Sequence, residues 1–311
     1  MILHCTGIPI VLSYIYDYDA SMHSNKKIIF LNAGTETRKA FIRGIGDTPY
    51  EWYHTKRMML HIKDTTPSFL YRSMPVDWKD AVVFTRLRGN DQQFSGMLYD
   101  FFTHNNITAN DSINGSYENS SEKIAQMLTL TLAGIRVPES FIFREESFKR
   151  HKAYILERLT FPFIFKTDGS RGRNVVLITS EAEFDATMAI KPKYARALVQ
   201  PFIPNTFDTR TIVAFGEILG SIKRTRTSGF LNNIAQGAIP EVYELTDAEK
   251  ELAIRAARVC GTDVAGVDMI HTEEGPIVLE VNKSPQIHGF ESVHHFKVFE
   301  KIARLMLERM K

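Results

Sequence analysis

The stretch Gly266–Pro285, GVDMIHTEEGPIVLEVNKSP, decides the fold that the rest of the chain is expected to adopt. It predicts two short strands separated by the turn-forming sequence HTEEG. Asp268 stands on the first strand, whereas Glu280 and Asn282 stand two apart on the second and so share one of its faces. If the strands are antiparallel neighbours, these three oxygen-bearing side chains converge on one point.

The residue types at these positions suit a hard divalent cation. Two carboxylates and an amide carbonyl, with no nitrogen or sulfur ligand, favour magnesium that is held partly by substrate phosphates. Ordinary outward-facing polar residues on an alternating hairpin are the other interpretation of this pattern. Asp268 favours the metal site, because it interrupts an apolar run where strand propensity disfavours aspartate.

A second motif lies upstream, where another predicted strand ends. Residues 161–166, FPFIFK, end in Lys166 and lead into TDGSRGRN, which contains two glycines, two arginines and a serine. Glycines let backbone amides approach a phosphate closely, and successive amides form an anion-binding nest. The motif is neither a P-loop, which needs a lysine after the second glycine and a following helix, nor a dinucleotide fingerprint. A phosphate-binding loop and a basic hairpin turn both stay open.

Three further segments follow in an order that fits a nucleotide site. Val199–Ile203 predicts a strand leading into an exposed segment, which can offer backbone groups to an adenine edge. Asp208 can accept hydrogen bonds from ribose hydroxyls, while Arg210 and the arginines of Lys223–Arg226 can pair with phosphate or a developing acyl phosphate. Each residue alone fits a surface ion pair better, and only their order along the chain favours a nucleotide.

Length and composition describe an ordinary globular protein. A chain of 311 residues exceeds the usual size of one hydrophobic core, so two or three subdomains are expected. The 38 basic and 36 acidic residues nearly cancel, which gives no overall electrostatic case for a nucleic-acid or membrane partner. With only Cys5 and Cys260, a disulfide framework and a cysteine zinc site are not expected, and a cytoplasmic location fits best. Neither a signal peptide nor a membrane helix, which needs about 20 apolar residues, is expected.

A polar, turn-rich segment, residues 105–121, separates an N-terminal region from the rest of the chain at about residue 115. In the first region, Lys27–Asn32 and Ala81–Thr85 predict buried strands of an α/β sheet. The apolar spacing of Gln93–Asn105 predicts a helix. Glu51–Ser73 is rich in histidine, lysine, arginine and methionine without a clean period, and it is left unassigned.

Short strands and helices alternate through two further predicted regions, 116–198 and 199–311. Ser180 and Thr246 are expected to cap helices in capping boxes with Glu183 and Glu249. The expected helices run from Ser120 or Ser121 to about Ala133, and over Ser180–Ile190, Thr246–Cys260 and His294–Met310. The expected strands are Phe163–Lys166, Asn174–Ile178, Ala197–Phe202, Thr211–Phe215, Glu217–Lys223, Val264–Ile270 and Pro276–Val281.

Taken together, these motifs resemble the ATP-grasp superfamily, and within it the RimK-type glutamate ligases. The resemblance covers about residues 116–290, and the metal motif is its most specific part. It implies two α+β subdomains that clamp ATP, preceded by an α/β pre-ATP-grasp domain. The three domains would then be 1–115, a central lid subdomain 116–198 and a metal-binding subdomain 199–311.

The resemblance also implies a role for individual residues. Lys123 and Lys166 match the nucleotide lysines, and Asp208 matches the ribose position. Arg210 and Arg224 match arginines near the transferred phosphate and the acceptor. The remaining implied nucleotide and catalytic positions are Asp168, Gly169, Ser170 and Gly172 in the phosphate loop, Gln200, Pro201, Phe202 and Ile203 in the hinge, and Asn232 with Asn233; the implied magnesium ligands are Asp268, Glu280 and Asn282.

Four positions depart from the family pattern. Pro201 stands where a hinge glutamate is usual, and Asn174 replaces a loop glycine, although asparagine tolerates left-handed backbone better than most residues. Lys283 and Gln286 change the usual small residues that follow the metal asparagine. These departures put the substrate in doubt more than the reaction.

The resemblance implies an ATP- and Mg²⁺-dependent carboxylate–amine ligase, with Mn²⁺ as a substitute metal. ATP phosphorylates a substrate carboxylate, and an amine attacks the acyl phosphate to form an amide, with glutamate or another amino acid as reactant. A ligase acting on a peptide or protein, recognised through Glu51–Ser73, is the main alternative. A nucleotide-binding module without catalysis is the other, although the retained metal residues and Arg210 argue against it. Nucleic-acid binding ranks last, no membrane partner is expected, and a homo-oligomer is left open.

Overall fold

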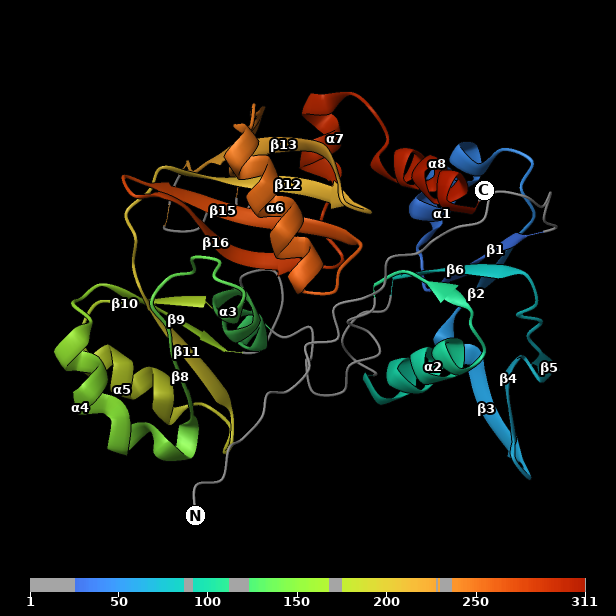
Figure 1. Cartoon of the computed structure of the whole chain (residues 1–311). Helices are drawn as coiled ribbons and strands as arrows, with labels where there is room; N and C mark the ends of the chain where they lie inside the picture. The colour runs from blue at the N-terminus through green and yellow to red at the C-terminus, as the bar shows by residue number, and fades with distance from the viewer. Residues whose placement is uncertain are drawn as a thin grey trace, which may run out of the picture.

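In the computed structural model, the described residues are 26–86, 92–111, 123–167, 175–227, 229 and 237–310. They form two four-stranded sheets, one five-stranded sheet and one three-stranded sheet. The N-terminal sheet lies on one side of the molecule, and the central and C-terminal sheets lie on the other, one below the other (Figure 1). This mixed architecture confirms the predicted α/β class.

The N-terminal sheet is parallel and has the strand order β2-β1-β6-β7. Parallel strands are buried on both faces, and the apolar runs of β1 and β6 meet this requirement. Helix α1 covers one face and α2 the other, which confirms both predicted strands and the predicted helix. The elements are β1 (Lys27–Leu31), α1 (Thr35–Ile45), β2 (Tyr50–Tyr53), β6 (Ala81–Thr85), α2 (Gln92–His104) and β7 (Thr108–Ala109).

The unassigned segment Glu51–Ser73 forms the end of β2 and most of a small antiparallel sheet of order β3-β4-β5. Met58 and Leu60 on β3 pack against a core that contains Phe69 of β4. Only the base of the hairpin is therefore buried, which explains why its sequence shows no clean period. The elements are η1 (Thr55–Arg57), β3 (Met58–Lys63), β4 (Thr66–Tyr71) and β5 (Met74–Pro75).

The central sheet is antiparallel with the order β10-β9-β11-β8, and helices α4 and α5 pack on it around Phe184. Ser180 caps α5 as predicted, by accepting a hydrogen bond from the Glu183 backbone. The predicted capping box is wrong in its second half, because the Glu183 carboxylate accepts from Thr179 instead. The elements are β8 (Phe141–Arg144), η3 (Glu145–Ser147), α4 (Phe148–Arg158), β9 (Phe163–Thr167), β10 (Val175–Ile178), α5 (Glu181–Ala189) and β11 (Arg196–Pro201).

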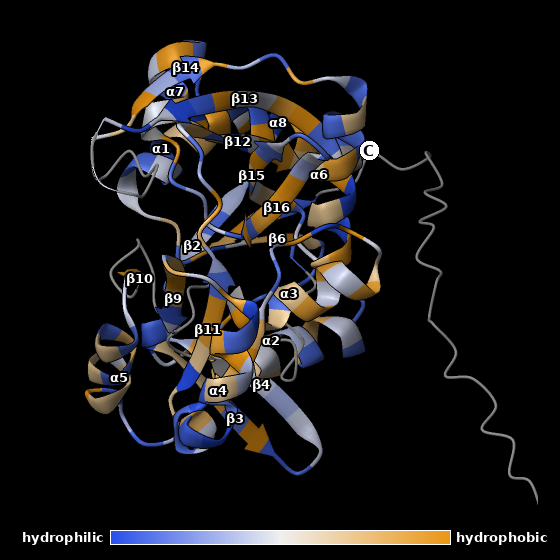
Figure 2. Cartoon of the chain, turned by 90° about the vertical axis from the view of Figure 1, so that its left-hand side faces the viewer, coloured by the Kyte–Doolittle hydropathy of each residue, from blue (hydrophilic) through white to orange (hydrophobic). Residues whose placement is uncertain are grey.

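The C-terminal sheet is antiparallel with the order β14-β13-β12-β15-β16, which confirms both predicted hairpins. Thr246 and Glu249 form the predicted capping box at the start of α6. Helices α6 and α3 bury one face of this sheet, and its hydrophobic strands β15 and β16 stand out in Figure 2. The elements are α3 (Lys123–Leu132), β12 (Phe207–Ala214), β13 (Glu217–Thr225), β14 (Ile239–Val242), α6 (Asp247–Val259), β15 (Val264–Thr272) and β16 (Gly275–Asn282).

The predicted single helix His294–Met310 is wrong at its start. The chain forms α7 (His288–His294), turns at His295 with a left-handed φ of 55°, and begins α8 (Val298–Met310) later. His294 is not a solvated helix start, because its ring stacks on Phe290 and its Nε2 lies 2.8 Å from the Ser221 carbonyl. The histidine is thus fixed against β13.

Hydrophobic cores contain residues from both sides of the domain boundaries predicted at residues 115 and 198. These boundaries therefore stay predictions. Helix α8 packs on α1, and a Cβ added to Gly44 of α1 would clash with the Glu300 carbonyl of α8. Helix α3 contributes Ile124, Met127 and Leu130 to the core of the C-terminal sheet. Within the described ranges, no helix is long and apolar enough to cross a membrane.

Candidate active site

A row of charged residues crosses three neighbouring strands of the C-terminal sheet. Arg210 on β12 is the register partner of Asp268 on β15, and Asp268 is the partner of Glu280 on β16. Directly paired residues of antiparallel strands have their side chains on the same face. Asp268 and Glu280 therefore lie side by side, as the pattern of the two strands predicted, and the structure adds Arg210 beside them.

Asn282 joins this row from two positions further along the same pair of strands. It is paired with Gly266, and its Nδ2 lies 3.5 Å from Asp268 Oδ2. A bulge follows at Asp268/Met269, where β16 carries one extra residue, Leu279. Glu280 and Asn282 share the face of Asp268 because they stand two apart on β16 and Glu280 is paired directly with Asp268.

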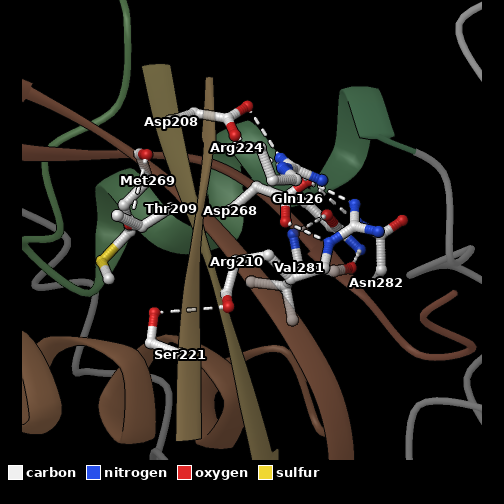
Figure 3. Close-up of polar contacts among 10 residues, drawn as sticks. All are labelled: Gln126, Asp208, Thr209, Arg210, Ser221, Arg224, Asp268, Met269, Val281 and Asn282. Carbon is white, nitrogen blue, oxygen red and sulfur yellow. Dashed lines mark hydrogen bonds and ion pairs between the residues drawn. The ribbon is translucent and has the colours of Figure 1, made fainter. Parts of the chain in front are cut away.

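Asp268 is held by two arginines (Figure 3). Arg210 donates from Nε to Oδ1 at 2.7 Å and from Nη2 to Oδ2 at 2.6 Å. Arg224 Nη2 approaches Oδ2 at 3.2 Å. This two-point geometry fixes the plane of the carboxylate, and the sheet supplies it before any ligand arrives.

Arg224 is itself shared between two carboxylates. It donates from Nε and Nη2 to the two oxygens of Asp208 at 2.6 and 2.7 Å, and its side chain is 2% exposed. Two arginines and two aspartates thus form a balanced, buried cluster, as a buried charge requires. The predicted ribose ligand Asp208 has both oxygens engaged here, so its ribose role stays a prediction.

The two aspartates differ in their titration. Burial alone would raise the pKa of Asp268, but Arg210 and Arg224 outweigh burial and lower that pKa to about 2. Burial raises the pKa of Asp208 to about 6 in spite of Arg224, and the negative charge of Asp268 adds to this rise. Asp268 is therefore the carboxylate that stays ionised over the whole physiological range.

Gln126 is a site residue that the sequence analysis missed. From α3, its Nε2 donates to the Val281 carbonyl at 2.7 Å, and its Oε1 accepts from the Val281 backbone at 3.1 Å. The amide thus pairs with β16 as a neighbouring strand would, between Glu280 and Asn282. Its signal in the sequence was a polar residue on the apolar face of a predicted helix, and Gln126 is 5% exposed.

The predicted nucleotide residues of the central sheet also meet. Lys166 Nζ at the end of β9 donates to Gln200 Oε1 at 2.7 Å, and Gln200 Nε2 lies 2.9 Å from Ser140 Oγ. Pro201 ends β11, and Phe202 and Ile203 begin the half-buried connection to β12. The hinge thus joins the central and C-terminal sheets, while its adenine contacts stay a prediction.

Several predicted residues lie outside the part of the chain that the structure describes. Lys123 begins helix α3, but its side chain is not described. The others, in the phosphate loop and before β14, are Asp168, Gly169, Ser170, Gly172, Asn232 and Asn233.

The N-terminal part of the chain contacts the loop that follows β16. Arg86, after β6, donates from Nη2 to Ser284 Oγ at 2.6 Å, and its guanidinium lies 4.5 Å from the ring centre of Phe299. Lys283 is largely buried, and this burial lowers its pKa although the negative charge of Asp111 opposes the shift. These contacts place Lys283, one of the departures from the family pattern, and the neighbouring Ser284 against the first region of the chain.

Comparison with known proteins agrees with this geometry. Residues 120–306 match the model of the RimK-like ATP-grasp domain. The chain is 30% identical over 257 residues to a probable alpha-L-glutamate ligase of Syntrophotalea carbinolica, covering 80% of this chain and 83% of that protein. It is 41% identical over 136 residues to one of Parasynechococcus marenigrum, covering 42% of this chain and 29% of that longer protein.

A solved structure extends the likeness to the N-terminal part. The ATP-grasp ligase PsnB, complexed with minimal precursor, Mg and ADP, superposes with a TM-score of 0.65 at 17% identity, covering 94% of this chain and all of that one. The fold and the charged row define an ATP-grasp protein, as the resemblance predicted. The chain belongs to the RimK-like ATP-grasp family and is accordingly an ATP-dependent ligase that forms C–N bonds.

Proposed function

We propose that this protein uses ATP and Mg²⁺ to activate a substrate carboxylate as an acyl phosphate and joins it to the amine of an amino acid, with glutamate as the first candidate. The observation that carries the proposal is the Arg210–Asp268–Glu280 row with Asn282 beside it. Two relatives named probable alpha-L-glutamate ligase support the choice of glutamate. A cytoplasmic location belongs to the same proposal.

The donor set fits a magnesium ion. Asp268, Glu280 and Asn282 offer only oxygen or amide ligands from adjacent strands, and Mg²⁺ takes oxygen ligands while keeping waters and substrate phosphates. Asp268 is ionised at neutral pH, although its oxygens already accept from two arginines. When bound, the metal would neutralise phosphate charge. Mn²⁺, which accepts the same ligands, is expected to substitute.

The side chains of the chain itself then have separate tasks. Arg210 and Arg224 hold Asp268 in a fixed plane and place positive charge beside the position of the transferred phosphoryl group. Lys166, fixed by Gln200, supplies a second cation from the central sheet. Phosphoryl transfer needs alignment and charge stabilisation more than a nucleophilic side chain, so this arrangement suffices for the chemistry.

The first test is ADP release with Glu280→Gln. The substitution removes one charge but keeps the shape, and no carboxylate of the arginine cluster is lost. Turnover with amino acids should fall at least about a hundredfold, the size expected when one electrostatic contributor to the transition state is lost. The turnover of Asp268→Asn should fall as far, but this substitution also removes a charged partner of Arg210 and Arg224.

Glu273→Gln, exposed in the turn between β15 and β16, is the matched control and should retain normal turnover. Thermal unfolding must show that all three variants are folded. Near-normal ADP release by folded Glu280→Gln and Asp268→Asn proteins would overturn the metal assignment. Omitting Mg²⁺ should abolish ADP release by the wild type.

A ligase acting on a peptide is the second candidate, and one observation favours it. The segment Glu51–Ser73, which the sequence left unassigned, contains a projecting β3–β4 hairpin (Figure 1). Its Met59 and Ile62 are exposed and are not part of the buried N-terminal core. ADP release stimulated by peptides but not by free amino acids would favour this candidate over the first.

A further inference from the structure

The β3–β4 hairpin concentrates positive charge in a chain that is nearly neutral. Residues 54–75 contain four lysines and arginines but a single acidic residue, Asp64, whereas the chain as a whole carries 38 basic and 36 acidic residues. On and before β3, the exposed side chains are Lys56, Arg57, Met59, His61, Ile62 and Lys63. None of them belongs to the ligase site, so their clustering needs another explanation.

One edge of this small sheet is long enough to accept another strand. Among the described residues, β3 pairs only with β4, and the sheet order β3-β4-β5 leaves β3 at an edge. The opposite edge, β5, has two residues and ends in Pro75, which is a common way to block strand addition. β3 has six residues and no proline, so its edge is not blocked in that way.

The strand is also held rigid while presenting apolar contacts. Met58 and Leu60 pack into the core beneath the hairpin, which fixes the backbone of β3. Met59, on the other face, is 53% exposed, and Ile62, towards the tip, is 64% exposed. An added strand would therefore find an ordered backbone, flanking apolar side chains and basic groups at both ends.

We propose that β3 is the docking site of an extended, acidic peptide segment that adds to the sheet as a strand. Backbone hydrogen bonds along the β3 edge would give affinity, and carboxylates facing Lys56, Arg57 and Lys63 would select the partner. β3 lies apart from β12, β13 and β15, which carry the arginine–aspartate cluster (Figure 1), so a segment docked on β3 would recruit a substrate and take no part in the chemistry. This inference rests on the proposed ligase function, with a peptide as the carboxylate substrate.

The test measures the fluorescence anisotropy of a labelled eight-residue peptide of alternating glutamate and valine, titrated with the full chain. We expect saturable binding that weakens about tenfold or more in Lys56→Glu/Arg57→Glu/Lys63→Glu, since three exposed charge contacts are reversed. Lys149→Glu/Arg150→Glu on α4 reverses an equally exposed basic pair elsewhere and should bind as the wild type does. The same peptide N-methylated at alternate residues should not bind, because strand addition needs its backbone amides.

The docking site would be overturned by equal binding of the triple variant, by equal binding of the N-methylated peptide, or by preferential binding of a single-stranded oligonucleotide that displaces the peptide. Concentration-dependent dimerisation abolished by Met59→Asp would also overturn it, since a second copy would then occupy the edge. Anisotropy needs no turnover, so it tests docking even if ADP release fails. ADP release with free amino acids should be unchanged in the triple variant, which separates the two proposals.

Discussion

At the scale of single residues, the site depends on close contacts that admit no extra atom. A Cβ added to Gly266 would lie 2.7 Å from the Cβ of Pro285, and Arg210 Cδ lies 3.7 Å away on the same side. The missing side chain lets the loop after Asn282 fold back over β15. Gly266 thus holds the loop in place by its size rather than by a special backbone conformation.

Gly266→Ala is therefore expected to lower kcat with a smaller effect on folding. The new methyl group must push Pro285, and with it Ser284 and Lys283, away from the charged row. Overpacking of this kind costs about 1–3 kcal/mol of stability. ADP release and chemical denaturation measure the two effects, and Gly34→Ala, whose added Cβ meets nothing within 4 Å, is the control. Full activity of Gly266→Ala would show that the loop position is unimportant.

At the scale of elements, helix α3 supports β16 from the side. Gln126 takes both hydrogen bonds of the Val281 backbone on the edge of β16, between Glu280 and Asn282. The helix is otherwise anchored by apolar residues of the C-terminal core. Helix α3, which precedes the central sheet in the chain, therefore supplies hydrogen bonds to the edge strand of the C-terminal sheet.

Replacing Gln126 should change the metal dependence of the enzyme. Gln126→Ala leaves the buried N–H and C=O of Val281 without these partners, at a cost of about 1–3 kcal/mol for each unsatisfied group. We expect the Mg²⁺ concentration for half-maximal ADP release to rise several-fold, beyond any loss of stability. Leu128→Ala, on the exposed face of the same helix, should leave it unchanged. A stability loss with unaltered Mg²⁺ dependence would restrict Gln126 to a structural role.

At the scale of the whole molecule, a reciprocal contact joins the N-terminal part to the C-terminal sheet. The Asp111 backbone donates to Asp263 Oδ2 at 2.8 Å, while Asp111 Oδ1 accepts from the backbones of Asp263 and Val264 at 2.7 and 3.1 Å. Burial, together with the negative charge of Asp263, raises the pKa of Asp111 to about 7. This link is therefore sensitive to pH near neutrality.

The raised pKa predicts a specific pH dependence of stability. The unfolded carboxyl titrates near pH 4, so between about pH 4 and 7 the folded protein holds a proton that the unfolded chain releases. The contribution of Asp111 to the free energy of unfolding must then fall as the pH rises through this window. Asp111→Asn keeps the acceptor oxygen and removes the buried charge.

Asp111→Asn should thus be more stable than the wild type at pH 8 by a few kcal/mol, since one pKa unit corresponds to about 1.4 kcal/mol, with the difference shrinking towards pH 4. Chemical denaturation at pH 5, 6.5 and 8 measures this, and Asp47→Asn on the exposed surface is the control. Equal slopes of stability against pH in Asp111→Asn and wild type would contradict the buried, raised-pKa carboxyl.

Alternation and short-range spacing were enough to predict most strands of the central and C-terminal sheets, the β15–β16 hairpin and the family, because they place Asp268, Glu280 and Asn282 together once two strands pair. The order of the motifs also predicted that Lys166 and Arg210 belong to one site, and this stays a prediction. Only the tertiary structure decided what those residues contact. Gln126 reaches Val281 across 155 positions of sequence, and Arg224 takes Asp208 and Asp268 together, because sheet packing rather than local spacing brings them within hydrogen-bond distance.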